Sequence, residues 1–150
     1  MERLGILGGT FDPVHVAHVA AACEAHHQLG LDRVLLVVAG DPWQKRGEVV
    51  ASAEDRFAMV AAAVEGVDGL EASRAEIDRP GPTYTIDTVE AMRAPDRELT
   101  LIVGSDAAAG IESWERAGAL REAVRLAVVG REHDRSAPAG WRRNLHGHFA

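Results

Sequence analysis

The chain has 150 residues, 47% of them hydrophobic and 26% charged, which predicts one globular domain and excludes a largely disordered chain. Its formal net charge of −7 argues against the broad basic surface that non-specific nucleic-acid binding requires, so no nucleic-acid partner is expected. The single Cys23 excludes a disulfide within the chain, and the absence of a signal peptide or membrane-length apolar run predicts a cytoplasmic protein with no membrane partner.

The first predicted element is a short buried strand at residues 4–7, which runs into a glycine pair. Gly8 and Gly9 have no Cβ, so the chain can turn sharply there. The same lack of side chains allows a phosphate to approach the backbone N–H groups. This strand and turn therefore predict the start of a phosphate cradle.

Two histidines follow the glycine pair at the expected start of a helix. Pro13 suits a position just before or at a helix start. If the helix begins near Val14, His15 and His18 lie on one face of its first turns, beside the positive end of its dipole. Anions bind readily there. Either histidine could instead be a core residue. The pair could also suggest a metal site, but no third metal ligand is evident nearby in the sequence.

A strand, a helix and a second strand make up the first third of the chain. Residues 16–29 are rich in alanine and predict a helix that Gly30 ends. In it, Cys23 is expected to be a buried thiol, and His26 is expected at the surface. The β-branched and leucine run within residues 33–39 is typical of a strand covered on both faces. Together they predict a right-handed βαβ unit.

The middle of the chain begins with a loop at residues 40–50. Ser52, with Asp55 three residues later, resembles a capping box and predicts a helix that extends to about Val64. Residues 70–77 alternate loosely between apolar and polar and predict a weaker strand.

A Pro-Gly-Pro sequence at residues 80–82 then breaks the chain. A helix is expected over residues 86–93, with Thr83 or Thr85 as its N-cap.

The last predicted elements surround a second strand-to-helix turn. A buried strand at residues 98–103 ends in Gly-Ser-Asp, and short helices are expected at 107–111 and about 114–123. Residues 125–129 predict the final strand. The sequence thus predicts an α/β fold, a doubly wound (Rossmann-like) parallel sheet of about five strands with helices on both faces. This domain is expected to span residues 1–130, followed by an irregular tail at 131–150.

Four motifs, in order along the chain, resemble those of a known family. Residues 8–18, Gly-Gly-Thr-Phe-Asp-Pro-Val-His-Val-Ala-His, resemble the signature of the nucleotidyltransferase superfamily with a His-x-Gly-His motif. Pro-Trp-Gln-Lys at 42–45, Gly-Pro-Thr-Tyr-Thr-Ile-Asp-Thr at 81–88, and Gly-Ser-Asp-Ala at 104–107 followed by Trp114 resemble bacterial nicotinate mononucleotide adenylyltransferases.

The resemblance implies adenylyl transfer from ATP to nicotinate mononucleotide, which gives deamido-NAD and pyrophosphate. It also implies Mg²⁺ bound through the ATP phosphates. The residues it implies are, at the phosphates, His15, His18 and Lys45; at the nucleotide, Gly8, Gly9, Thr10, Phe11, Gly104, Asp106 and Arg131; and at the nicotinate group, Tyr84, Thr85 and Trp114.

The chemistry is compatible with these residue types. The attacking group is already a phosphate anion, so catalysis depends on alignment and on stabilising charge at the α-phosphate and the departing pyrophosphate. Simpler structural roles are open for several of these side chains. Trp114 could be a core residue, Lys45 a solvated loop residue, Tyr84 a loop brace and Asp106 a helix cap.

The sequence departs from the family pattern in two places. Ala17 stands where the His-x-Gly-His motif has glycine. Residues 131–150 contain no Ile-Ser-Ser-Thr-x-x-Arg motif, the segment that in this family grips the ATP phosphates. Three explanations are open: tail arginines replace this grip in part, a homo-oligomer completes the site, or the protein binds nucleotide without turnover. A different adenylyl- or cytidylyltransferase of the superfamily is a further alternative. The tail arginines are Arg131, Arg135, Arg142 and Arg143.

Overall fold

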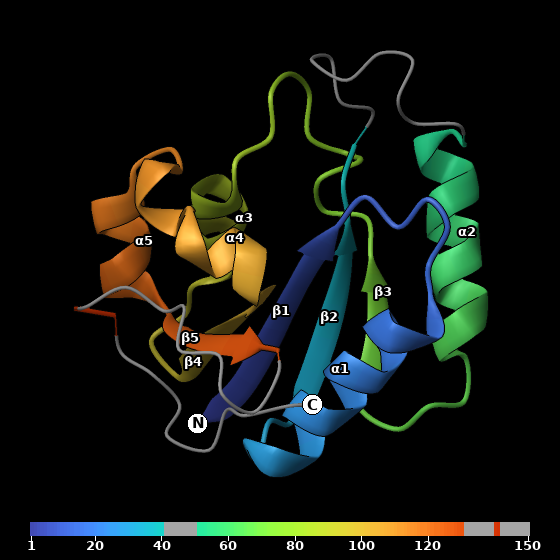
Figure 1. Ribbon diagram of the computed structural model, residues 1–150, viewed down its shortest axis with the longest axis horizontal. Coiled ribbons are helices and arrows are strands. Elements are labelled where there is room, and N and C mark those ends of the chain that lie inside the picture. Colours follow the sequence, from blue (N-terminus) through green and yellow to red (C-terminus); the bar gives the residue numbers. More distant parts are fainter. Residues whose placement is uncertain (41–50, 131–139, 142–150) are drawn as a thin grey trace.

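The computed structural model describes residues 1–40, 51–130, 140 and 141, where five strands alternate with helices (Figure 1). None of the helices in this part of the chain has both the length and the hydrophobicity needed to span a membrane. The strands are β1 (Glu2–Gly9), β2 (Arg33–Val38), β3 (Leu70–Ser73), β4 (Arg97–Gly104) and β5 (Arg125–Val129). The helices are α1 (Val16–Gln28), α2 (Ala53–Val64), α3 (Thr85–Met92), α4 (Ser105–Ala109), the 3-10 helix η1 (Ile111–Ser113) and α5 (Ala117–Ala123).

The strands form one parallel sheet in the order β3-β2-β1-β4-β5. Leu4 of β1 pairs with Arg33 of β2 on one side and with Leu99 of β4 on the other. The chain runs outward from β1 to β3 and then returns to β4, so the direction of winding reverses between β1 and β4. In such sheets, ligands bind beyond the carboxyl ends of the strands at this reversal. The predicted doubly wound sheet is thus confirmed.

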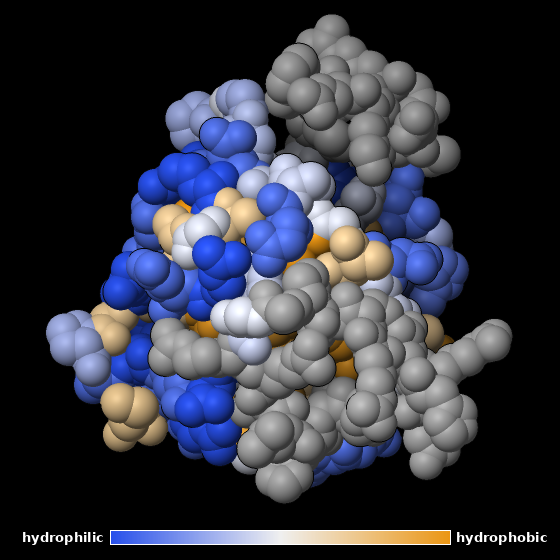
Figure 2. Space-filling view, turned by 60° about the vertical axis from the view of Figure 1, so that its left-hand side comes forward, coloured by the Kyte–Doolittle hydropathy of each residue, from blue (hydrophilic) through white to orange (hydrophobic). Residues whose placement is uncertain are grey.

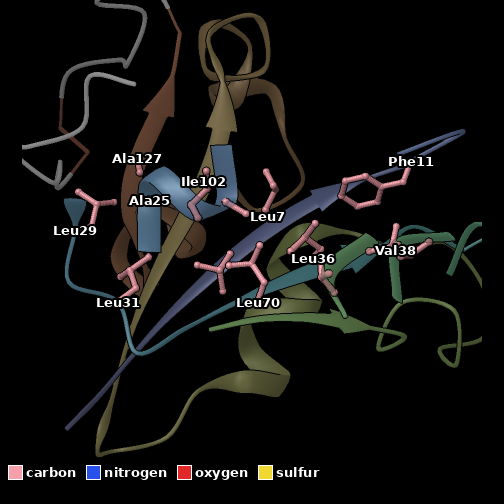
Figure 3. Packing of buried hydrophobic residues seen from close by; sticks show 14 residues of the cluster. Leu7, Phe11, Ala25, Leu29, Leu31, Leu36, Val38, Leu70, Ile102 and Ala127 are labelled. Atoms are coloured by element: carbon pink, nitrogen blue, oxygen red, sulfur yellow. The ribbon is translucent and has the colours of Figure 1, made fainter. Parts of the chain in front are cut away.

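Apolar side chains on the two faces of the sheet form two clusters, one under each group of helices. Leu7, Leu36 and Ile102 belong to the cluster under α1 and α2 (Figure 3). Ile6 and Leu101 belong to the cluster that packs against α3, α4 and α5. Ile6 and Leu7 are consecutive and lie on opposite faces, as the two-residue period of a strand requires. The central strands are therefore covered on both sides, as the apolar run of β2 predicted.

The amino ends of the strands are joined by a network of ion pairs. Glu2 of β1 lies between Arg33 of β2, at 2.9 Å, and Arg97 of β4, at 2.8 Å. These contacts lower the pKa of Glu2, chiefly through the hydrogen bond from Arg33. These ion pairs therefore lie at the amino ends of the strands, opposite the carboxyl ends where ligands bind in such sheets. The remaining members are Arg3 and Glu98, Arg125 and Glu98, and Arg33 and Glu71.

The face of the molecule that carries α5 is mostly polar where its residues are described (Figure 2). Figure 2 shows largely hydrophilic residues, with small hydrophobic areas between them, on the face that carries α5. Among the described residues, the large hydrophobic side chains that are exposed are Met1, Val16 and Tyr84.

Two elements in the middle of the chain differ from their prediction. β3 ends at Ser73, not at residue 77, because the chain turns at the following residues, where Arg74 pairs with Glu54 of α2 at 2.6 Å. Asp78 N–H donates to the Arg74 carbonyl, which closes a turn where strand was expected. The N-cap of α3 is Tyr84, so neither predicted threonine caps it, and the helix begins one residue earlier than predicted.

The region after β4 also differs in its boundaries. α4 begins at Ser105, directly after Gly104, and ends at Ala109, and α5 begins at Ala117. Trp114 lies between η1 and α5 and does not start a helix. The backbone of Arg116 is left-handed, with φ of 48°, so no continuous helix can run from residue 114.

One expectation for α1 is confirmed and two are changed. The helix begins at Val16, as the alanine-rich segment predicted, because the extended backbone of His15, with ψ of 159°, makes that residue the N-cap. Cys23 is partly exposed and packs against the α1 and α2 cluster, so its burial is incomplete. His26 is half-buried beside Gly69, and its Nδ1 is buried without a hydrogen-bond partner in the described part of the chain.

Candidate functional site

A cavity of about 280 Å³ lies at the carboxyl ends of β1 and β4, where the winding of the sheet reverses. It brings together five predicted site residues from four separate segments: Gly8, Gly9, Thr85, Gly104 and Trp114. Three other polar or small residues line it that were not predicted as site residues: Glu76, which lies outside the motifs, and Thr88 and Ala107, which are the last residues of two of them. The remaining wall is formed by Ile6, Leu7, Leu101, Ile102 and Val103.

The glycines of the cavity have different neighbours. A Cβ added at Gly8 or Gly104 would meet no atom within 4 Å, so both positions face open space. A Cβ at Gly9 would lie 3.1 Å from the ring of Phe11. Gly8 and Gly104 therefore keep the cavity open, and Gly9 allows the strand end to pack against Phe11.

Phe11, His15 and His18 form a small ring cluster at the start of α1. The Phe11 side chain is 3% exposed, and the backbone of this residue is left-handed, with φ of 52°. Its ring meets that of His18 edge-on, with the ring centroids 5.0 Å apart. The rings of His15 and His18 stack with their centroids 5.5 Å apart. The predicted juxtaposition of the two histidines is thus present, with His15 at the N-cap and not within the helix.

The hydrogen bond between the two histidines determines which tautomer the neutral His18 ring adopts. The backbone N–H of His15 donates to Nδ1 of His18 at 2.8 Å. Since Nδ1 accepts, the proton of the neutral ring lies on Nε2, which can donate to an anion. Burial, and secondarily the nearby His15, lower the pKa of His18. The first turn of α1 also contains no acidic residue, so its positive dipole end is not neutralised locally.

Arg56 joins the segments around the glycine turn, a role that the sequence did not predict. The side chain is fully buried, and its Nη1 donates to the Thr10 and Ala39 carbonyls, each at 2.8 Å. The same guanidinium donates to the carbonyls of Ala51, at 3.2 Å, and Gly40, at 3.4 Å. The start of α2 is therefore attached to the ends of β1 and β2. A signal was present, because Arg56 lies at helical spacing from buried residues of α2.

Tyr84 and Thr85 lie at the start of α3, beside the cavity. Tyr84 is 41% exposed and is not part of the cavity wall, whereas Thr85 is. The carbonyl of Tyr84 accepts from the N–H groups of Asp87 and Thr88. The preceding N–H groups, of Thr85 and Ile86, belong to the first turn and have no acceptor within the helix. They are suited to meet an anionic group from the cavity.

A second missed feature is a hydrogen-bonded group of three side chains at the same wall. Arg79 Nη1 donates to Thr88 Oγ1 at 3.0 Å, and Thr88 Oγ1 donates to Glu76 Oε2 at 2.7 Å. Burial raises the pKa of Glu76, and the Thr88 hydrogen bond and the charge of Arg79 oppose that shift. The sequence placed Glu76 within a predicted strand, and a single glutamate there gave no signal for this role.

The other predicted residues lie outside the cavity wall or outside the described residues. Thr10 is placed by its carbonyl contact to Arg56, and Asp106 is exposed on α4. Lys45, Arg131 and the tail at 131–150 fall outside the residues that the structure describes. In the described ranges, no group of three or more His, Cys, Asp or Glu side chains is arranged to hold a metal ion.

Comparison with known proteins gives relatives in sequence and in fold. A probable nicotinate-nucleotide adenylyltransferase from Saccharopolyspora erythraea is 47% identical over 132 residues, 87% of this chain and 62% of the relative. One from Acidothermus cellulolyticus is 43% identical over 146 residues, 92% of this chain and 70% of the relative. The chain spans about three fifths of the length of the first two curated relatives that it matches.

Solved structures share the fold at low sequence identity. The structure described as Plasmodium falciparum nicotinic acid mononucleotide adenylyltransferase complexed with NaAD matches with a TM-score of 0.75 and 17% identity, over 90% of this chain and 67% of that chain. A putative nicotinate-nucleotide adenylyltransferase from Vibrio parahaemolyticus matches with a TM-score of 0.69 and 18% identity, over 85% and 73%. The model of the family described as cytidylyltransferase-like matches residues 6–147. Because this match covers most of the chain, which also has a cavity where the winding of the sheet reverses, the chain belongs to the cytidylyltransferase-like family.

Proposed function

We propose that this protein transfers the adenylyl group of ATP to nicotinate mononucleotide, giving deamido-NAD and pyrophosphate in NAD biosynthesis. The observation that carries the proposal is the cavity at the sheet reversal, which joins Gly8, Gly9, Thr85, Gly104 and Trp114. The two relatives described above, each named a probable nicotinate-nucleotide adenylyltransferase, support this choice of reaction.

The cavity is proposed to receive the nicotinate ring. Trp114 offers an aromatic surface on which a planar ring can stack. The nicotinate carboxylate would be held by the first-turn N–H groups of α3, at Thr85 and Ile86, with Tyr84 beside them. A helix N-terminus binds a carboxylate because its backbone donors and dipole both favour negative charge.

ATP is proposed to lie over the glycine turn and the start of α1. Gly8 and Gly9 allow its phosphates to approach the backbone, and His15 and His18 donate to them from the helix N-terminus. His18 has its Nε2 proton available for this, because Nδ1 accepts from the His15 N–H. Further nucleotide contacts are proposed at Thr10, Phe11, Lys45, Gly104, Asp106 and Arg131.

The reaction requires alignment and charge stabilisation and no protein nucleophile. The phosphate of the acceptor attacks the α-phosphorus of ATP, the bond to the β-phosphate oxygen breaks, and pyrophosphate leaves with the electron pair. Donors from the glycine turn and the histidines stabilise the negative charge in the transition state. Mg²⁺ bound through the ATP phosphates would neutralise further negative charge. No all-protein metal site is needed for this, because Mg²⁺ usually keeps several waters and binds mainly through substrate phosphates.

Pyrophosphate release with a panel of acceptors tests the proposal. With ATP and Mg²⁺, nicotinate mononucleotide should give pyrophosphate at a higher kcat/KM than nicotinamide mononucleotide or phosphopantetheine. CTP in place of ATP should be a poor donor. If no acceptor yields pyrophosphate while calorimetry shows ATP binding, adenylyl transfer is wrong and nucleotide binding alone remains.

A further inference from the structure

Glu76 is the one titratable side chain among the residues that line the described cavity. The rest of the wall consists of glycines, aliphatic residues, two threonines and Trp114. The segment that carries Glu76 lies close to the end of β2, since a Cβ at Gly40 would be 3.1 Å from the Glu76 carbonyl oxygen. A carboxylate is therefore placed in a cavity that otherwise has no side-chain charge.

The hydrogen bonds around Glu76 have a fixed direction. Arginine can only donate, so Arg79 must donate to the Thr88 hydroxyl. The hydroxyl hydrogen of Thr88 then points to Glu76 Oε2, which must accept. Arg79 and Thr88 thus orient the carboxyl group through Oε2. The other oxygen, Oε1, makes no hydrogen bond to the described residues and is free to face a ligand.

The position of Glu76 has an energetic cost to the folded protein. Burial disfavours the charged form and raises the pKa of this carboxyl group. Its direct hydrogen-bond partner is a neutral hydroxyl, not a cation. An uncharged glutamine of the same shape could accept from Thr88 equally well. The hydrogen bond therefore does not require a negative charge at Glu76, and the charge of Arg79 offsets the effect of burial on its pKa only in part.

We propose that Glu76 is the counter-charge for the pyridinium ring of the acceptor nucleotide and thereby selects acceptors with a positively charged ring. This inference rests on the proposed function. The ring nitrogen of nicotinate mononucleotide is bonded to ribose and is formally positive. The carboxylate of Glu76 attracts this charge, and the face of Trp114 adds a cation–π interaction.

The two charges of the nicotinate group would have different partners at one wall. Its carboxylate would meet the N–H groups at the start of α3, and its positive ring nitrogen would meet Glu76, which is hydrogen-bonded to Thr88 of the same helix. An acceptor with an uncharged ring of the same size loses the second interaction alone.

A binding cycle with two proteins and two ligands tests the proposal. Wild-type protein and Glu76→Gln are titrated by calorimetry with nicotinate mononucleotide and with its 1,4-dihydro form, whose ring is uncharged. We expect wild type to favour the pyridinium form by roughly tenfold or more, and Glu76→Gln to lose most of that preference. ATP affinity should be unchanged in the variant. Glu90→Gln, a change of the same charge on the exposed face of α3, is the matched control and should behave as wild type.

Stability measurements separate this role from a structural one. Because burial raises the pKa of Glu76, the penalty of its charge is absent well below the ordinary pKa of 4.5 and complete above the raised value. Glu76→Gln should therefore be at least as stable as wild type at pH 7. An equal preference for the pyridinium form in both proteins, or a loss of affinity that matches a loss of stability, would overturn the proposal.

The proposed function can fail separately. If wild-type protein shows the expected charge preference and Glu76→Gln loses it, but wild type releases no pyrophosphate, the reaction is wrong and the role of Glu76 stands. If it releases pyrophosphate and Glu76→Gln keeps the preference, the role of Glu76 is wrong and the reaction stands. Absence of any binding to wild type would reject both.

Discussion

At the scale of one residue, a substitution at Gly8 should affect substrate binding without reducing fold stability. A Cβ at this position meets no protein atom within 4 Å, so Gly8→Ala fits the empty cavity without strain. We expect unchanged or slightly higher stability, because alanine loses less backbone entropy than glycine in a strand. The added methyl group displaces the nucleotide, and kcat/KM should fall by roughly 100-fold, the cost of about 1 Å of misalignment.

Gly5→Ala is the matched control for this change. Its Cβ would lie 2.8 Å from Leu31 Cδ1 and 3.1 Å from Val34 Cγ2, so this variant should lose stability first. Thermal unfolding and pyrophosphate release measure the two properties. A Gly8→Ala protein with wild-type kcat/KM would show that this wall of the cavity does not meet substrate.

His18 combines a structural acceptor and a proposed catalytic donor in one ring. His18→Asn can keep an acceptor for the His15 N–H but lacks Nε2–H, so turnover should fall by roughly 100-fold or more with little loss of stability. A lowered pKa also predicts the sign of the pH dependence. The stability that neutral His18 contributes is complete above the ordinary pKa of 6.5 and is lost as pH falls through the lowered value.

Thermal unfolding of wild type and His18→Asn between pH 5 and 8 checks this sign. Wild type should lose stability relative to the variant on the acid side. Parallel pH profiles would contradict a lowered pKa for His18. Losses of turnover and stability of similar size would indicate a structural histidine with no role at the phosphates.

Arg56 organises the elements around the site, because one guanidinium serves four carbonyls from three segments. Arg56→Met leaves these buried acceptors without their donor and should cost roughly 2–4 kcal/mol in the free energy of unfolding. The exposed Arg74 also touches α2, through Glu54, so Arg74→Met is the matched control and should have a much smaller effect. Urea unfolding measures both. Equal losses would mean that the buried contacts of Arg56 are not what holds the glycine turn.

Sequence patterns predicted the elements better than their ends. Short apolar runs or loose alternation identified the strands, and alanine content identified α1. The capping-box pattern identified α2, where the Ser52 hydroxyl does accept from the Asp55 N–H at 3.1 Å. Short elements were less predictable because their ends depend on tertiary contacts. β3 ends where the Asp78 N–H bonds to the Arg74 carbonyl in a turn, and the left-handed backbone of Arg116 delays α5. Neither feature can be read from local composition.

At the scale of the whole molecule, the strand order explains how much of the site was predictable. Motifs at residues 8–18, 81–88 and 104–107 were assigned to one site, and the winding reversal between β1 and β4 brings part of each to one cavity. Arg56 and Glu76 were not predicted. Their roles depend on which carbonyls or hydroxyls lie opposite them, and residues far apart in sequence supply those groups.

The most direct test of the central claim is a fluorescence titration of Trp114 in the cavity wall. Nicotinate mononucleotide stacked on this indole should quench its emission in a saturable way, because Trp114 lines the cavity. Trp114→Phe should remove that saturable component and weaken acceptor binding, with thermal unfolding near that of wild type. Identical quenching curves for the two proteins would contradict the account, because the pyridine nucleotide would then bind elsewhere than between β1 and β4.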